Sequence, residues 1–172
     1  MAPEQNENRL THLATGEAGE AEARMVDVGQ KPVTARAALA RAEVVFPAGV
    51  LARIEAGEGP KGSLRALCEV ARVAGILAAK RTGELIPMCH PLGLDHVELG
   101  FERGGEDSLV ITCRCACEGR TGIEMEAMTG ASIAALTVYD MTKAMAKGIR
   151  VEAVELLEKL GGKSGHWRSP RA

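Results

Sequence analysis

The chain has 172 residues, a length that suits one domain with its own buried core. Hydrophobic residues make up 46% of it but aromatic residues only 2%, so the core must be aliphatic, and stacking platforms for nucleic-acid bases are not expected. A net charge of −2 and a pI near 6.1 give no general attraction to nucleic acid or anionic membranes, and no segment approaches the roughly 20 apolar residues that span a bilayer.

The N-terminal region predicts a tail rather than a folded element. Residues 1–24 are polar, acidic and low in complexity, so we expect them to be disordered and a single domain to occupy residues 25–172. The pattern of a charged segment followed by an apolar one, which marks secretion, is missing, and we therefore expect a cytoplasmic protein. The five cysteines, an odd number, are expected to stay reduced.

Three elements are expected in the first half of the domain: a strand over residues 42–46, a helix over residues 47–56 and a longer helix over residues 64–81. Pro47 suits the first turn of the shorter helix. Ser63 can cap the longer helix, in which apolar residues recur every three and four positions. This stripe predicts a helix with one face against the core.

The second half predicts strands over residues 95–101 and 108–118, a helix over residues 128–147 and a strand over residues 149–160. Apolar and polar residues alternate in the first two strands, and Gly104 and Gly105 suit the turn between them. Gly148 is expected to end the helix. The start of the helix stays open, because residues 123–126 also fit continued strand alternation.

These elements follow the order β-α-β-β-α-β with one extra helix. The order predicts a ferredoxin-like α+β fold, in which a four-stranded antiparallel sheet packs one face on two long helices. The other face must be solvated or covered, and its valine-rich strands favour covering by another subunit.

Four charged residues interrupt an alanine-rich segment: Glu124, Glu126, Asp140 and Lys143. A carboxylate withdrawn from water costs several kcal/mol unless it is paired, so buried acids of this kind meet a cation, a ligand or a subunit boundary. The alternative is that all four line the solvated face of an amphipathic helix.

His90 lies between Pro87 and Pro91, which restrict the backbone and fix the direction of the imidazole. It is either a polar loop residue or a functional one. The neighbouring Cys89 adds a second metal-binding atom, but a single adjacent Cys and His pair lacks the ligand spacing of a zinc site.

Cys113, Cys115 and Cys117 alternate, so a strand points all three thiols to one face. Three thiols at this spacing can bind a soft metal, but cysteine is also a small residue that is commonly buried. Because the same face continues Ile111, we favour a core role and predict no metal site.

Cations recur in glycine-rich or terminal settings, such as Lys61 in Gly-Pro-Lys-Gly and Lys163 in Gly-Gly-Lys-Ser-Gly. Glycine lets a backbone and a ligand approach closely, although the second motif lacks the strand and helix of a P-loop. Each cation alone is typical of a solvated surface. Together they can neutralise a polyphosphate, and the set is Arg36, Lys61, Lys143, Lys147 and Lys163.

Several long motifs occur in one order: Met88-Cys-His-Pro-Leu, Gly122-Ile-Glu-Met-Glu-Ala-Met-Thr, Thr137-Val-Tyr-Asp-Met-Thr-Lys-Ala and the terminal Gly161-Gly-Lys-Ser-Gly. On these motifs the chain closely resembles the molybdenum cofactor biosynthesis protein C family, over about residues 10–167. The resemblance implies a ferredoxin-like subunit, a hexamer built as a trimer of dimers, and active sites at subunit boundaries. It also implies a cyclic pyranopterin monophosphate synthase, which rearranges a cyclic dihydro-GTP intermediate and releases pyrophosphate.

The resemblance also implies residue roles, with Asp140 and Lys143 as the catalytic pair. The other implied catalytic residues are Lys61, His90, Glu124 and Glu126, and the implied substrate contacts are Met88, Cys89, His90, Met125 and Glu126. Ring opening and closure need proton transfers, and departing pyrophosphate needs cations. The candidate cations for that charge are Lys31, Arg36, Lys61, Lys147 and Lys163.

We expect no cofactor held by a protein site, with Mg²⁺ able to accompany the substrate triphosphate. Two other classes stay open. A nucleotide-sensing module without catalysis would have no need of Asp140, and substrate turnover with pyrophosphate release separates it from an enzyme. A metal-handling protein would use Cys89, His90 and the strand cysteines, and metal analysis would detect it.

Overall fold

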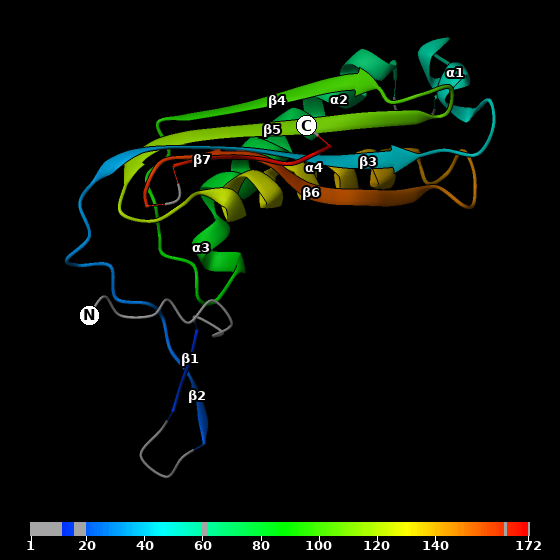
Figure 1. Cartoon of the computed structure of the whole chain (residues 1–172). Helices are drawn as coiled ribbons and strands as arrows, with labels where there is room; N and C mark the ends of the chain where they lie inside the picture. Colours follow the sequence, from blue (N-terminus) through cyan, green and yellow to red (C-terminus); the bar gives the residue numbers. More distant parts are fainter. Residues whose placement is uncertain (1–11, 16–19, 60–61, 164, 172) are drawn as a thin grey trace.

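The computed structural model describes residues 12–15, 20–59, 62–163 and 165–171. Two long helices cover one face of a five-stranded antiparallel sheet (Figure 1). Across the sheet the strands are β4 (His96–Arg103), β5 (Ser108–Gly119), β3 (Thr34–Val45), β6 (Arg150–Leu160) and β7 (His166–Arg168). The helices are α1 (Val50–Glu55), α2 (Leu64–Lys80), α3 (Thr82–Leu85) and α4 (Glu124–Thr142). The predicted ferredoxin-like α+β fold is confirmed by the order β4-β5-β3-β6 with α2 and α4 on one face.

Strand β3 is much longer than the five residues predicted from sequence. It begins at Thr34, pairs with β5 on one side and with β6 on the other, and so forms the centre of the sheet. Its first half is rich in alanine, which has a low intrinsic preference for strands. Pairing on both sides overrides that preference, and no local sequence pattern reports such long-range pairing.

Helix α2 agrees with the prediction, and the Ser63 hydroxyl accepts a hydrogen bond from the Ala66 backbone N–H at 3.4 Å. Helix α4 differs, since it begins at Glu124 and ends at Thr142 rather than spanning residues 128–147. Gly148, with a φ of 88°, lies in the turn that leads into β6 and does not cap the helix. The early start puts Glu124 and Glu126 in the first turn of a helix, and the strand alternative is wrong.

Three short strands were not predicted from the sequence. Strands β1 (Leu13–Thr15) and β2 (Ala21–Ala23) pair within the segment expected to be a disordered tail, and they extend away from the sheet (Figure 1). Strand β7 pairs with the outer edge of β6 and follows the last strand predicted from the sequence. Each strand has three residues, too short for a periodic pattern to show in sequence.

The core lies between the sheet and the two long helices. Cys113, Cys115 and Cys117 are buried there, so their predicted core role is confirmed. The opposite face of the sheet carries ion pairs, with Arg41 next to Glu155 at 2.7 Å. Charged residues thus occupy outward positions of the alternation, and covering of this face by another subunit stays a prediction.

Exposed apolar side chains lie on both layers. On the helices they are Val70, Val73 and Leu77 of α2 and Leu136 and Tyr139 of α4, and on the sheet they are Val154, Leu160 and Trp167. No helix among the described residues is long and apolar enough to cross a bilayer.

Candidate active site

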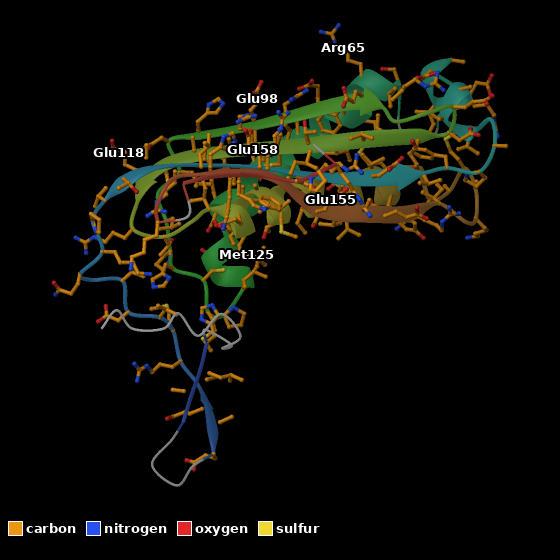
Figure 2. All side chains as sticks on the ribbon, viewed as in Figure 1. Arg65, Glu98, Glu118, Met125, Glu155 and Glu158 are labelled. Carbon is orange, nitrogen blue, oxygen red and sulfur yellow. The ribbon has the colours of Figure 1, made fainter. Side chains whose placement is uncertain are left out.

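A cavity of about 270 Å³ lies where the first turn of α4 meets the loop after α3. It collects most of the predicted substrate contacts. The lining residues that the sequence singled out are Lys31, Met88, Cys89, His90, Met125 and Glu126. Figure 2 shows Met125 on the helical side of the molecule. We name this space the acid–base cavity, after Glu126 and His90.

The loop and the N-terminal segment together orient His90. Its Nε2 lies 2.8 Å from the Val26 carbonyl oxygen, which can only accept a hydrogen bond. Nε2 therefore carries the proton, and in the neutral imidazole Nδ1 is left as an acceptor. His12, Val26 and Val28 also line this cavity. His12 was missed because it lies in the segment that composition assigned to a tail.

Glu126 is buried, with 4% of its surface exposed. Desolvation raises the pKa of its carboxyl above the ordinary range, a hydrogen bond from its own backbone N–H lowers it, and the nearby Glu124 carboxylate raises it again. A carboxyl with a raised pKa holds its proton to higher pH and suits the role of a general acid.

Glu124 is a partly exposed residue whose carboxylate lies 3.1 Å from the Lys159 ammonium on β6. It does not line the acid–base cavity, and Lys159 is a partner that the sequence did not indicate. Gly122 makes this placement possible, since a Cβ at that position would overlap the Glu124 carboxylate. The ion pair ties the start of α4 to the sheet.

A second cavity, of about 580 Å³, is lined by the cations Lys31, Arg36, Arg120 and Lys163. It shares Lys31, Thr121 and Gly122 with the acid–base cavity, so the two spaces adjoin. We name it the cation cavity. Arg120 was missed by the sequence analysis, although its setting in Gly-Arg-Thr-Gly directly before α4 resembles that of the other cations.

Arg36 and the glycine-rich turn after β6 pack against each other. Arg36 Nε donates to the Gly119 carbonyl oxygen at 3.3 Å, and its guanidinium lies so close to Gly162 that a Cβ there would clash. The turn thus places Lys163 beside Arg36. Lys147 lies after the other end of α4 and does not line this cavity.

Asp140 and Lys143 form an ion pair of 2.6 Å near the C-terminal end of α4, with side chains 58% and 57% exposed. The hydrogen bond to Asp140 raises the pKa of the Lys143 ammonium. Fourteen residues of helix separate Asp140 from Glu126, or roughly 21 Å along the axis. One chain therefore does not bring the predicted catalytic pair to the two cavities.

Lys61 lies outside the described residues. Gly59 and Gly62, on either side of it, line a small space together with Met141 and Met145. These glycines are thus at the Asp140 end of α4. Apart from Lys61, the predicted site residues form two groups, one toward each end of this helix.

The described residues include no cluster of three or more His, Cys, Asp or Glu side chains suited to a metal ion. Two neighbouring thiols, those of Cys113 and Cys115, have sulfur atoms 3.9 Å apart. Their hydrogen bond, together with burial, raises the pKa of the Cys115 thiol, which opposes the thiolate form that metals bind.

Comparison with known proteins identifies the family of the chain. The model of the MoaC family matches residues 25–162. Two relatives, from the J-10-fl and Y-400-fl strains of Chloroflexus aurantiacus, are each named cyclic pyranopterin monophosphate synthase. Each is 52% identical to this chain over 166 residues, which cover 95% of the chain and 97% of the relative. A chain that matches the family model over most of its length, and these relatives over nearly all of it, belongs to the MoaC family.

Proposed function

We propose that the chain is a cyclic pyranopterin monophosphate synthase of molybdenum cofactor biosynthesis. It takes the cyclic dihydro-GTP intermediate as substrate and forms cyclic pyranopterin monophosphate and diphosphate. Family membership supports this function, and one observation carries it: a cavity with an acid and an imidazole adjoins a cavity with four cations. A nucleotide-derived substrate has a ring system that needs proton transfers, attached to a triphosphate that needs neutralising.

In the acid–base cavity, Glu126 donates a proton to the ring system as it rearranges, and His90 Nδ1 accepts one. In the cation cavity, Arg36, Arg120 and Lys163 hold the triphosphate and stabilise the charge that develops on departing diphosphate. Lys31 lines both cavities and contacts the junction of sugar and phosphate. Mg²⁺ enters with the triphosphate, and no cofactor is held by the protein itself.

We further propose that a second copy of the chain supplies Asp140, Lys143 and Lys61. Half-exposed apolar side chains on α2 and α4, among them Val73 and Leu136, form a surface that association would bury. If two copies of α4 pack antiparallel about a two-fold axis, the first turn of one helix meets the last turn of the other. The two groups of site residues then meet, and three such dimers form the proposed hexamer.

A cytoplasmic location is part of the proposal. It is supported by five cysteines that are all free thiols, as expected where the surroundings are reducing.

The decisive test of this function is turnover of the cyclic dihydro-GTP intermediate by the purified chain. We expect cyclic pyranopterin monophosphate and diphosphate in equal amounts, measured by chromatography and a coupled diphosphate assay. Binding of the intermediate without product would support the nucleotide-sensing module instead. Stoichiometric metal in the purified protein, without turnover, would support the metal-handling alternative.

A further inference from the structure

The C-terminal strand β7 does more than extend the sheet, because it closes the turn that carries Lys163. Gly161, Gly162 and Gly165 in this turn all have positive φ values, of 99°, 73° and 61°. The Gly161 N–H donates to the Gly165 carbonyl oxygen at 3.0 Å, which draws the two ends of the turn together. Glycine can adopt many backbone conformations, so a turn rich in glycine is flexible unless both of its ends are held. A fixed position for Lys163 therefore needs one anchor before the turn and one after it.

The anchor on the first side is the long strand β6, and Gly161 also lies against the backbone of β3. A Cβ at Gly161 would overlap the Ala35 carbonyl oxygen, so the turn begins in close contact with the sheet. The anchor on the second side is β7, which has only three residues paired with β6. Backbone pairing this short is a weak restraint, and side-chain contacts must add to it.

The side-chain contact that adds to it is made by His166, the residue directly after Gly165. Its Nε2 lies 2.7 Å from Glu158 Oε1 on β6. The other oxygen of Glu158 lies 3.4 Å from the Arg114 guanidinium on β5, so the carboxylate is held from two directions. Glu158 is 18% exposed and His166 is 53% exposed. Figure 2 labels Glu158 among the side chains of the sheet.

We infer that His166 is a positioning residue of the active site, which acts through the turn on Lys163. By binding Glu158, it fixes the end of the turn at the sheet edge and so keeps the Lys163 ammonium at the cation cavity. This role rests on the proposed function insofar as the anion in the cavity is the substrate triphosphate. It concerns binding of phosphate groups and not the proton transfers at the other cavity.

The test uses pyrophosphate as the probe, with its Kd measured by isothermal titration calorimetry on the full chain at low salt. We expect His166→Ala to weaken pyrophosphate binding about 3- to 5-fold, the size expected for losing one partly exposed hydrogen bond. His166→Gln keeps a donor nitrogen at a similar reach and should restore most of the affinity. Arg168→Ala is the matched control: Arg168 lies on the same face of β7 and pairs across the strands with Glu158, but its side chain makes no hydrogen bond or ion pair among the described residues, and the variant should bind like wild type.

A double-mutant cycle separates positioning from a general loss of structure. In a Lys163→Ala background, His166→Ala should have little further effect on the pyrophosphate Kd, because the residue through which it acts is gone. In steady-state kinetics, His166→Ala should raise KM and leave kcat near wild type. Equal effects of His166→Ala with and without Lys163, or an unchanged Kd, would overturn the inference.

The outcome also distinguishes this inference from the proposed function. Pyrophosphate binding that depends on His166, in a protein that does not convert the cyclic dihydro-GTP intermediate, would contradict the function and leave the positioning role standing. Turnover of the intermediate, together with a pyrophosphate Kd that does not depend on His166, would support the function and contradict the positioning role.

Discussion

Glu126 and His90 share one cavity but are prepared in different ways. Burial in the first turn of α4 raises the pKa of the Glu126 carboxyl, whereas a backbone carbonyl selects which nitrogen of His90 carries the proton. Burial thus favours the protonated form of the Glu126 carboxyl. The backbone carbonyl determines which ring nitrogen of the neutral His90 carries the proton. Two titratable groups in unlike environments are the usual basis of acid and base assignments in an enzyme.

Glu126→Gln is expected to reduce turnover by about 10²- to 10⁴-fold, the usual contribution of a general acid or base. Because the folded-state pKa is raised, the folded chain holds this proton more tightly than the unfolded chain does. Stability is therefore lost as pH rises from the unfolded pKa through the folded pKa. The glutamine side chain of the variant does not titrate and so avoids this loss. The variant should therefore be more stable than wild type at alkaline pH, and this advantage should disappear toward acid pH.

Urea unfolding at a series of pH values measures this difference directly. Glu102→Gln, an exposed carboxylate on β4, is the control and should keep wild-type turnover. A stability difference that is the same at every pH would show that burial of the Glu126 charge is not what the substitution relieves.

At the scale of elements, the close approach of α2 and α4 sets the position of the acid–base cavity. Gly75 and Gly130 face each other where the helices meet, and a Cβ on Gly75 would lie 2.9 Å from the Gly130 carbonyl oxygen. A Cβ on Gly130 would lie 2.6 Å from the Cys113 sulfur. Small residues at this contact let α4 lie deep against the sheet, with Glu126 below the surface.

Gly75→Ala is expected to destabilise the protein by about 1–3 kcal/mol, because the obstacle is backbone and the core is already filled. Replacing glycine by alanine inside a helix otherwise stabilises a protein by about 1 kcal/mol. The sign of the change in the free energy of unfolding therefore shows which effect is larger. Denaturant unfolding measures it. Ala74→Gly, at a partly exposed position in the interior of the same helix, gives the propensity cost of glycine for comparison. A Gly75→Ala chain that is more stable than wild type would contradict the close contact.

On the scale of the whole molecule, the separation of the two site groups along α4 is the feature that motivates the proposed assembly. Glu126 and His90 lie at one end, and Asp140 and Lys143 at the other. The proposed two-fold packing joins one group from each copy. It also makes the contributions of the two copies separable by experiment.

Asp140→Asn and Glu126→Gln should each abolish most turnover as pure proteins. When their subunits are mixed and allowed to exchange, half of the dimers contain both variants, and one site of two in each such dimer is intact. About a quarter of wild-type turnover should then return. As the control, Asp140→Asn mixed with Lys143→Ala should recover none, since both changes fall in the same group. Mixed oligomers without recovered turnover would place both groups in one chain's own site.

The amino-acid sequence was enough to predict the fold class, the capped helix α2, the core role of the strand cysteines and the family motifs. Each of these depends on local periodicity, a cap residue or a run of residue types. The same information grouped Met88, Cys89 and His90 in one loop and Met125 and Glu126 in one turn. Proximity in the chain forces proximity in space there.

Only the tertiary structure decided which residues meet across long distances in the chain. Arg120 joins Lys31 and Lys163 at one cavity, and Lys159 pairs with Glu124, because the sheet brings strand ends together whatever their separation in sequence. The same geometry keeps Asp140 away from Glu126, since a helix is rigid and its length is set by its residue count. Sequence patterns report which face of an element is buried, but the pairing of strands determines which faces and ends become neighbours.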